Sequence, residues 1–159
     1  MMKSVVCYFS ATGTTKKVAV EIAADLQAEL VEIVPEVPYS EADLNWHDQN
    51  SRSSVEMNDK AFRPKIQPPA VDITQYDVIL LGFPIWWYVP PTVVNTFLEG
   101  FDLAGKKIYL FATSGGSPLD HAAKALAAST KGAELIKGRV LTPFHKDEIK
   151  AWLESAGLL

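Results

Sequence analysis

Four hydroxyl side chains occupy six consecutive positions near the start of the chain, in the run Ser10-Ala11-Thr12-Gly13-Thr14-Thr15. The run follows a short apolar stretch and precedes a segment with helical periodicity, so it would lie at the N-terminus of a helix. The unpaired amides and the positive dipole end of a helix favour an anion such as phosphate. A simple N-cap would need only one of these hydroxyls. The run has one glycine and no lysine, which excludes a Walker A loop and a GxGxxG fingerprint. We therefore predict a phosphate-binding loop that uses Ser10, Thr12, Gly13, Thr14 and Thr15.

A second candidate feature is the aromatic run Trp86-Trp87-Tyr88, which follows Pro84 and Ile85 at the end of another apolar stretch. Three consecutive large rings cannot all point into one core. Aromatic rings are good stacking surfaces for a planar ligand, and binding sites combine such walls with a few polar groups. We predict that residues 84–88 contribute at least one ring to a ligand site, while another ring packs into the core.

A third candidate feature is the small-residue turn Thr113-Ser114-Gly115-Gly116-Ser117, which follows a further apolar stretch. Glycine allows the backbone to approach a ligand closely, with its N–H groups free to donate. The turn alone is a weak signal, because such turns are common between a strand and a helix. We predict that Thr113, Ser114, Gly115 and Gly116 belong to the same ligand site.

The same turn also admits a different class of function. Residues 112–116 read A-x-S-x-G, one residue away from the G-x-S-x-G nucleophile elbow of serine hydrolases. Asp120 and His145 follow Ser114 in the chain order that those enzymes use. The short chain and the hydroxyl cluster at Ser10 count against this alternative, since a hydrolase would leave that cluster unexplained.

The elements between these features alternate between strand and helix. Short apolar runs without periodicity predict buried strands, and apolar residues spaced three or four apart predict helices. Five strands alternating with helices indicate an open, doubly wound α/β sheet, which binds ligands at the carboxyl ends of its strands. The predicted strands are 5–9, 30–34, 78–83, 107–112 and 134–141, and the predicted helices begin after Gly13 and cover 92–99, 118–128 and 145–155.

Residues 36–75 do not fit this alternation. They are rich in proline and have little periodicity, which in a compact domain indicates a missed element or a functional loop. Ser40 and Asp43 have the spacing of a capping box and predict one short helix. Because the segment also holds Trp46, His47, Arg52 and Arg63, we expect part of it to pack beside the three strand-end loops.

Length and composition narrow the classes of function. The chain has 159 residues with 48% apolar residues, which predicts a single domain over residues 1–159. Its formal charge of −4 argues against nucleic-acid binding. The single cysteine and three scattered histidines provide no metal-ligand spacing, and no apolar run is long enough to span a membrane. We expect a cytoplasmic protein without a metal.

The three loops together resemble those of the flavodoxin family. The family's first loop reads [ST]-x-T-G-x-[ST], and residues 10–15 satisfy that pattern. The stretch Gly82-Phe83-Pro84-Ile85-Trp86-Trp87 and the turn Thr113-Ser114-Gly115-Gly116 are similar to those of flavodoxin-like proteins related to small flavin reductases. The similarity extends over the whole chain.

This resemblance implies a three-layer sandwich whose five-stranded parallel sheet has the order 2-1-3-4-5, with helices on both faces. It implies FMN as the cofactor, with the phosphate on residues 10–15 and the isoalloxazine between loops 84–88 and 113–117. The redox chemistry would be that of the flavin, and no catalytic side chain is assigned. The partner would be either a redox protein or a small quinone or NAD(P)H-type substrate, so electron carrier and reductase both remain open.

Overall fold

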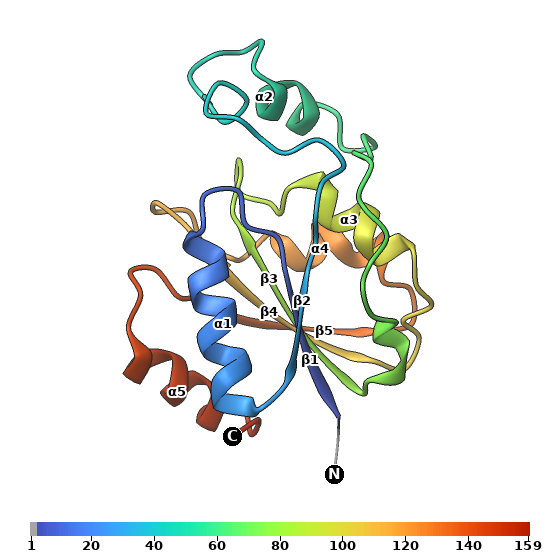
Figure 1. Cartoon of the computed structure of the whole chain (residues 1–159), viewed down its shortest axis with the longest axis vertical. Helices are drawn as coiled ribbons and strands as arrows, with labels where there is room; N and C mark the ends of the chain where they lie inside the picture. The colour runs from blue at the N-terminus through green and yellow to red at the C-terminus, as the bar shows by residue number, and fades with distance from the viewer. Residues whose placement is uncertain (1–2) are drawn as a thin grey trace.

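The computed structural model describes residues 3–159 and contains one sheet of five parallel strands (Figure 1). The strands lie in the order β2-β1-β3-β4-β5, and every neighbouring pair is parallel. This confirms the predicted fold class and strand order. The strands are β1 (Ser4–Tyr8), β2 (Glu29–Glu32), β3 (Val78–Pro84), β4 (Lys107–Thr113) and β5 (Glu134–Val140). The helices are α1 (Thr14–Leu26), α2 (Arg52–Met57), α3 (Thr92–Glu99), α4 (Ala122–Leu126) and α5 (Lys146–Ser155), with 3₁₀ turns η1 (Ile73–Gln75) and η2 (Ala127–Ser129).

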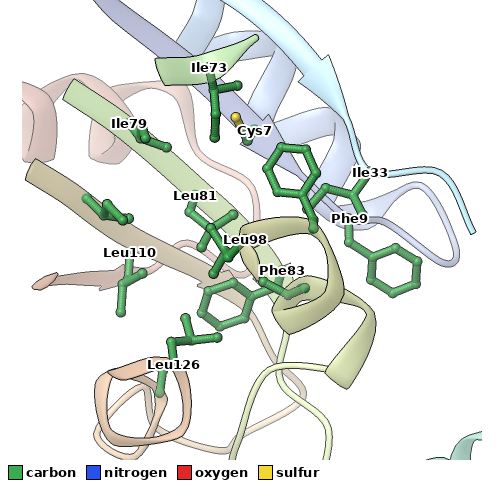
Figure 2. Packing of buried hydrophobic residues seen from close by; sticks show 14 of the residues in the cluster. Cys7, Phe9, Ile33, Ile73, Ile79, Leu81, Phe83, Leu98, Leu110 and Leu126 are labelled. Carbon is green, nitrogen blue, oxygen red and sulfur yellow. The ribbon is translucent and has the colours of Figure 1, made fainter. Parts of the chain in front are cut away.

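Helices cover both faces of the sheet and create two hydrophobic cores. On one face, α1 and α5 pack Ile22 and Ile149 against β1, β3 and β4. On the other, Leu98 of α3 and Leu126 of α4 point toward Leu81 and neighbouring residues of the central strands (Figure 2). The central strands are apolar on both faces, as the short unbroken runs in the sequence predicted.

The predicted helix boundaries agree well with the structure except at α4. Proline before Thr92 and glycine after Glu99 delimit α3, which begins and ends where predicted. The helix predicted over 118–128 begins only at Ala122 and continues as the 3₁₀ turn η2, because residues 119–121 form a turn. Among residues 3–159, no helix is long and apolar enough to cross a bilayer.

The segment between β2 and β3 leaves the sheet and returns to it. Pro35 and Ile66 form an antiparallel bridge at the base of this segment. The Glu36 amide donates to the Lys65 carbonyl and the Gln67 amide to the Val34 carbonyl, so the two ends of the segment lie side by side. We call the enclosed residues 36–65 the excursion. It carries α2 and projects beyond the carboxyl ends of the strands (Figure 1).

The helix of the excursion begins later than the sequence indicated. Ser40 and Asp43 exchange the hydrogen bonds of a capping box, yet only turns follow them. Asn45 and Asp48 accept hydrogen bonds from amides two residues ahead, in Asx turns that compete with helix formation. The helix therefore starts at Arg52, where Ser51 accepts the capping bond from the Ser54 amide.

An ion pair fastens the excursion to the main body. Arg63 donates to both carboxylate oxygens of Glu99 in α3, at 2.8 and 3.1 Å, and Ser129 donates to the same carboxylate at 2.8 Å. The Arg63 guanidinium, more than the Ser129 hydroxyl, holds the pKa of Glu99 below its usual range. A depressed carboxyl pKa stabilises the fold above the unfolded-state pKa, and this contribution is lost as the pH falls through the folded-state pKa.

We therefore expect Glu99→Gln to make stability less sensitive to acid. The wild-type protein should lose more of its free energy of unfolding between pH 7 and about pH 3 than the variant. The reason is that the pKa of Glu99 lies below that of an unfolded Glu, about 4.3, so protonation at low pH favours the unfolded state. Urea unfolding at the two pH values measures this difference. Arg63→Met should reduce the loss of free energy of unfolding between pH 7 and about pH 3 by a similar amount. An unchanged pH dependence in both variants would contradict the assignment.

Candidate functional site

A cavity of about 770 Å³ opens at the carboxyl ends of β1, β3 and β4. All of the predicted site residues except Ser10 and Gly13 line it, so the structure brings the three loops together. The loops contribute Thr12, Thr14, Thr15, Pro84, Ile85, Trp86, Trp87, Tyr88, Thr113, Ser114, Gly115 and Gly116. Ala11, Leu44, Trp46, Ser53, Ser117 and Pro118 complete the wall.

The first loop divides its hydroxyls between capping and the cavity. Ser10 Oγ accepts hydrogen bonds from the amides of Gly13 and Lys16, both at 3.1 Å, and so caps α1. Gly13 has a φ of 93°, a left-handed conformation that glycine adopts without strain. Thr12 and Thr14 are exposed at the cavity. Within residues 3–159, no acceptor satisfies the amides of Thr12, Thr14 and Thr15.

The third loop is fixed to the first and the second by hydrogen bonds. The buried hydroxyls of Thr15 and Thr113 lie 2.7 Å apart. The Ile85 amide donates to the Thr113 carbonyl at 3.0 Å. The Ser114 amide donates to Thr142 Oγ1 at 2.9 Å. The bonds of Thr113 to Thr15 and to Ile85 therefore fix the three loops relative to one another.

The aromatic loop contains a strained turn. Trp86 and Val89 exchange backbone hydrogen bonds of 2.9 and 3.2 Å around Trp87 and Tyr88, whose φ angles are 47° and 72°. Positive φ at both central positions is the pattern of a type I′ turn, which favours Asn-Gly. A bulky L-residue in this region costs roughly 1–2 kcal/mol. Such strain concentrates at functional sites. Here the strained turn places the side chains of Trp87 and Tyr88 at the cavity.

Replacing Trp87 and Tyr88 by Asn and Gly should relieve this strain. The side chains of Trp87 and Tyr88 are 43% and 58% exposed, so the variant also loses the buried part of both rings. A double alanine variant loses the same burial and keeps the strained φ angles, so it is the matched reference. We expect the Asn-Gly variant to exceed the double alanine variant by about 1 kcal/mol in free energy of unfolding without cofactor, after allowing for the entropy cost of glycine. Denaturant unfolding of the two variants measures this difference, and equal stability would contradict the assignment of strain to the turn.

The excursion supplies a further wall of the cavity. Leu44, Trp46 and Ser53 line the same space as the strand-end loops, which confirms the expectation that this segment packs beside them. Tyr39 connects the excursion to the aromatic loop, since its ring lies edge-on to Trp86 with centroids 5.4 Å apart. Phe9 of the core meets the same two rings at 5.7 and 5.8 Å.

A polar cluster keeps the excursion folded against this wall. Arg52 donates to the buried carboxylate of Glu56 at 2.9 Å and to the carbonyl of Val37 at 2.8 Å, and it stacks over the Tyr39 ring at 3.9 Å. The Tyr39 hydroxyl donates to Glu56 at 2.5 Å. Burial, followed by this bond to a carboxylate, raises the pKa of Tyr39. Tyr39 therefore stays protonated and serves as a hydrogen-bond donor.

The residues of the hydrolase alternative do not assemble. Ser114 Oγ accepts from the Gly116 amide, Asp120 pairs with Lys137, and His145 lies at the start of α5. No hydrogen bond joins these three residues anywhere in the described part of the chain. The structure therefore gives the hydrolase no support.

Among residues 3–159, no group of three His, Cys, Asp or Glu side chains could hold a metal ion.

The three loops can be recognised in the sequence, whereas most of the excursion's share of the site cannot. Trp46 is one of the side chains that distinguish the segment from a passive connector. Ser53 had no such signal, because a serine in an irregular segment is unremarkable. It reaches the cavity only through the fold of the excursion, which depends on contacts between residues far apart in the sequence.

Comparison with known proteins places the chain among flavoproteins. A family model described as Flavodoxin matches residues 3–156. A candidate flavoprotein from Bacteroides eggerthii DSM 20697 is 43% identical with a TM-score of 0.91, and the match covers 99% of each chain. A flavoprotein from Lactobacillus acidophilus NCFM, solved in complex with FMN, is 26% identical with a TM-score of 0.72, and the match covers 96% of this chain and 99% of that one. A search of curated proteins gives no match.

Proposed function

The chain belongs to the flavodoxin family, and we propose that it is an FMN-binding redox protein. The observation that carries the proposal is that a helix N-terminus with free amides and an aromatic wall open into one cavity. A flavin mononucleotide needs an anion site beside a stacking site. The complex of the Lactobacillus acidophilus flavoprotein with FMN supports the same cofactor.

The donor set of the cavity fits FMN. The hydroxyls and amides of Thr12 and Thr14, with the amide of Thr15, would hold the phosphate at the positive end of α1. Trp86 and its neighbours in loop 84–88 would stack on the isoalloxazine, with loop 113–117 opposite. Ser10 keeps these amides in position by capping α1 instead of facing the phosphate. When bound, the flavin supplies the transfer of electrons, and the protein positions it and limits the access of water.

Between carrier and reductase, we favour a reductase. The net charge of −4 is small for a carrier that steers protein partners by charge. In addition, the excursion lines the cavity with Leu44, Trp46 and Ser53, which form a wall beyond the three strand-end loops. A small oxidant or reductant could bind against this wall, whereas a carrier needs an open surface on which a protein partner docks.

The visible spectrum of the purified protein tests the cofactor. We expect a yellow protein whose released chromophore has the mass of FMN, or a colourless protein that takes up added FMN stoichiometrically. A colourless protein that fails to bind added FMN would overturn the proposal. Labelling of Ser114 by an active-site serine reagent would instead restore the hydrolase.

A further inference from the structure

One side chain of the cavity has no role in holding FMN as proposed above. Ser53 is 2% exposed, and its hydroxyl has no hydrogen-bond partner among residues 3–159. Burying an unpaired hydroxyl is costly, so a native structure rarely keeps one without a reason. Ser53 lines the cavity, and rotation about one bond moves its hydroxyl among three staggered positions. It is thus a hydrogen-bond donor without an acceptor at a ligand site.

The wall around Ser53 is apolar and aromatic. Leu44 lines the cavity beside it, and Trp46, which is 65% exposed, adds a broad ring at the mouth. The His47 ring stacks on Trp46 with centroids 3.7 Å apart and limits the orientations of the indole. A flat ring is the shape that such a wall accommodates best.

The charge of the cavity restricts the ligand further. None of the described residues that line it is Asp, Glu, Lys, Arg or His. A dinucleotide would bring a pyrophosphate into this uncharged space, in addition to the FMN phosphate, without a cation to pair with it. Burying an unpaired charge costs far more than burying a neutral group. The lining therefore favours an uncharged ligand.

We propose that the excursion forms a second ligand site beside the flavin, for a neutral planar aromatic compound that carries a carbonyl group. The carbonyl accepts a hydrogen bond from Ser53, and the ring packs against Trp46 and Leu44. The proposal rests on the proposed function, because it places this ligand next to bound FMN. It also selects the quinone-type ligand over the nicotinamide nucleotide at this site.

Calorimetric titration of the oxidised, FMN-loaded protein with 1,4-naphthoquinone tests the proposal by binding alone, without turnover. We expect saturable binding to the wild type. Ser53→Ala should weaken it roughly three- to tenfold, as expected for one neutral hydrogen bond. Trp46→Ala should also weaken it. Val55→Ala, on the same helix but outside the cavity, should not change it. The charged 1,4-naphthoquinone-2-sulfonate should bind at least about tenfold more weakly than the neutral quinone.

Two further measurements separate the site from the cofactor and from the fold. FMN affinity, followed by flavin absorbance, should be the same in wild type and Ser53→Ala. The thermal midpoint of Ser53→Ala should equal or exceed that of the wild type, because the variant removes an unpaired buried hydroxyl. A holoprotein that binds FMN but not naphthoquinone would overturn this inference and leave the proposed function standing. Weaker FMN binding by Ser53→Ala would also overturn it, by assigning the hydroxyl to the cofactor.

Discussion

A variant in which Thr12 and Thr14 are both alanine should bind FMN about two to four orders of magnitude more weakly than the wild type. A hydrogen bond to a charged group is worth about 1.5–3 kcal/mol, so two such bonds amount to about 3–6 kcal/mol. Each factor of ten in Kd corresponds to about 1.4 kcal/mol. Either single variant should lose roughly ten- to a hundredfold. Fluorescence titration of the cofactor-free protein with FMN measures these constants.

Riboflavin, which lacks the phosphate, is the matched ligand for this experiment. Its affinity should change little in the double variant, because Thr12 and Thr14 are proposed to contact the phosphate and not the ring. Ser10→Ala is the matched variant. Its hydroxyl caps α1, so its loss should lower stability by about 1 kcal/mol, weaken FMN less than the double variant does and leave riboflavin binding nearly unchanged. Equal losses for FMN and riboflavin in the double variant would show that the threonines support the fold and do not hold the phosphate.

The sequence predicted the parts of this site that depend on local chemistry. Hydroxyls at a helix N-terminus, rings after a strand and glycines in a turn can each be recognised within a few residues. The carboxyl ends of parallel strands meet at one edge of the sheet, so three local patterns were enough to predict one shared cavity.

The parts that were missed depend on contacts between distant residues. Ser53 becomes a cavity residue because Arg52 holds the carbonyl of Val37 and Tyr39 packs against Trp86. None of these pairs has a spacing that a sequence pattern could reveal. The capping box at Ser40 shows the same limit at shorter range, because the predicted box forms and the Asx turns after it prevent the helix.

The strained turn at Trp87 and Tyr88 is a further feature that local preference would have argued against. Type I′ turns favour Asn and Gly, and two aromatic residues are poor choices for them. The structure keeps the turn because reciprocal backbone bonds and the packing of Trp86 against Tyr39 and Phe9 determine its shape. Departures from local preference are therefore informative about where this protein binds its ligand.

Gly138→Ala should destabilise the protein more than any of the other single substitutions. Gly138 is the extra residue of a bulge in β5, since Lys137 pairs with Leu110 and Arg139 with Phe111. A Cβ at this position would lie 2.0 Å from the Leu110 carbonyl oxygen and 2.6 Å from the Trp152 ring. The oxygen belongs to the backbone of β4 and cannot move aside. We expect a loss of at least about 3 kcal/mol, at the upper end of overpacking costs, in a domain whose total stability is about 5–15 kcal/mol. Urea unfolding measures it.

Gly100→Ala is the control for the change from glycine to alanine itself. Gly100 has a φ of −78°, and the nearest atom to its added Cβ would be the Phe97 carbonyl oxygen at 3.4 Å, so its stability should change by less than about 1 kcal/mol. Equal stability of the two variants would mean that the backbone of β4 and β5 shifts enough to accommodate the added Cβ without cost.

The bulge also determines the position of the third loop, and this links Gly138 to the site. It sets the register in which Leu141 donates to Ala112 at 2.8 Å and Thr142 accepts from the Ser114 amide at 2.9 Å. If β5 shifts in Gly138→Ala, loop 113–117 loses its support. In the proposed complex, this loop contacts the flavin ring and not the phosphate. Under conditions in which the variant stays folded, FMN and riboflavin should therefore lose affinity by the same factor. A selective loss of FMN, as expected for the threonine variant, would contradict the assignment of this loop to the ring.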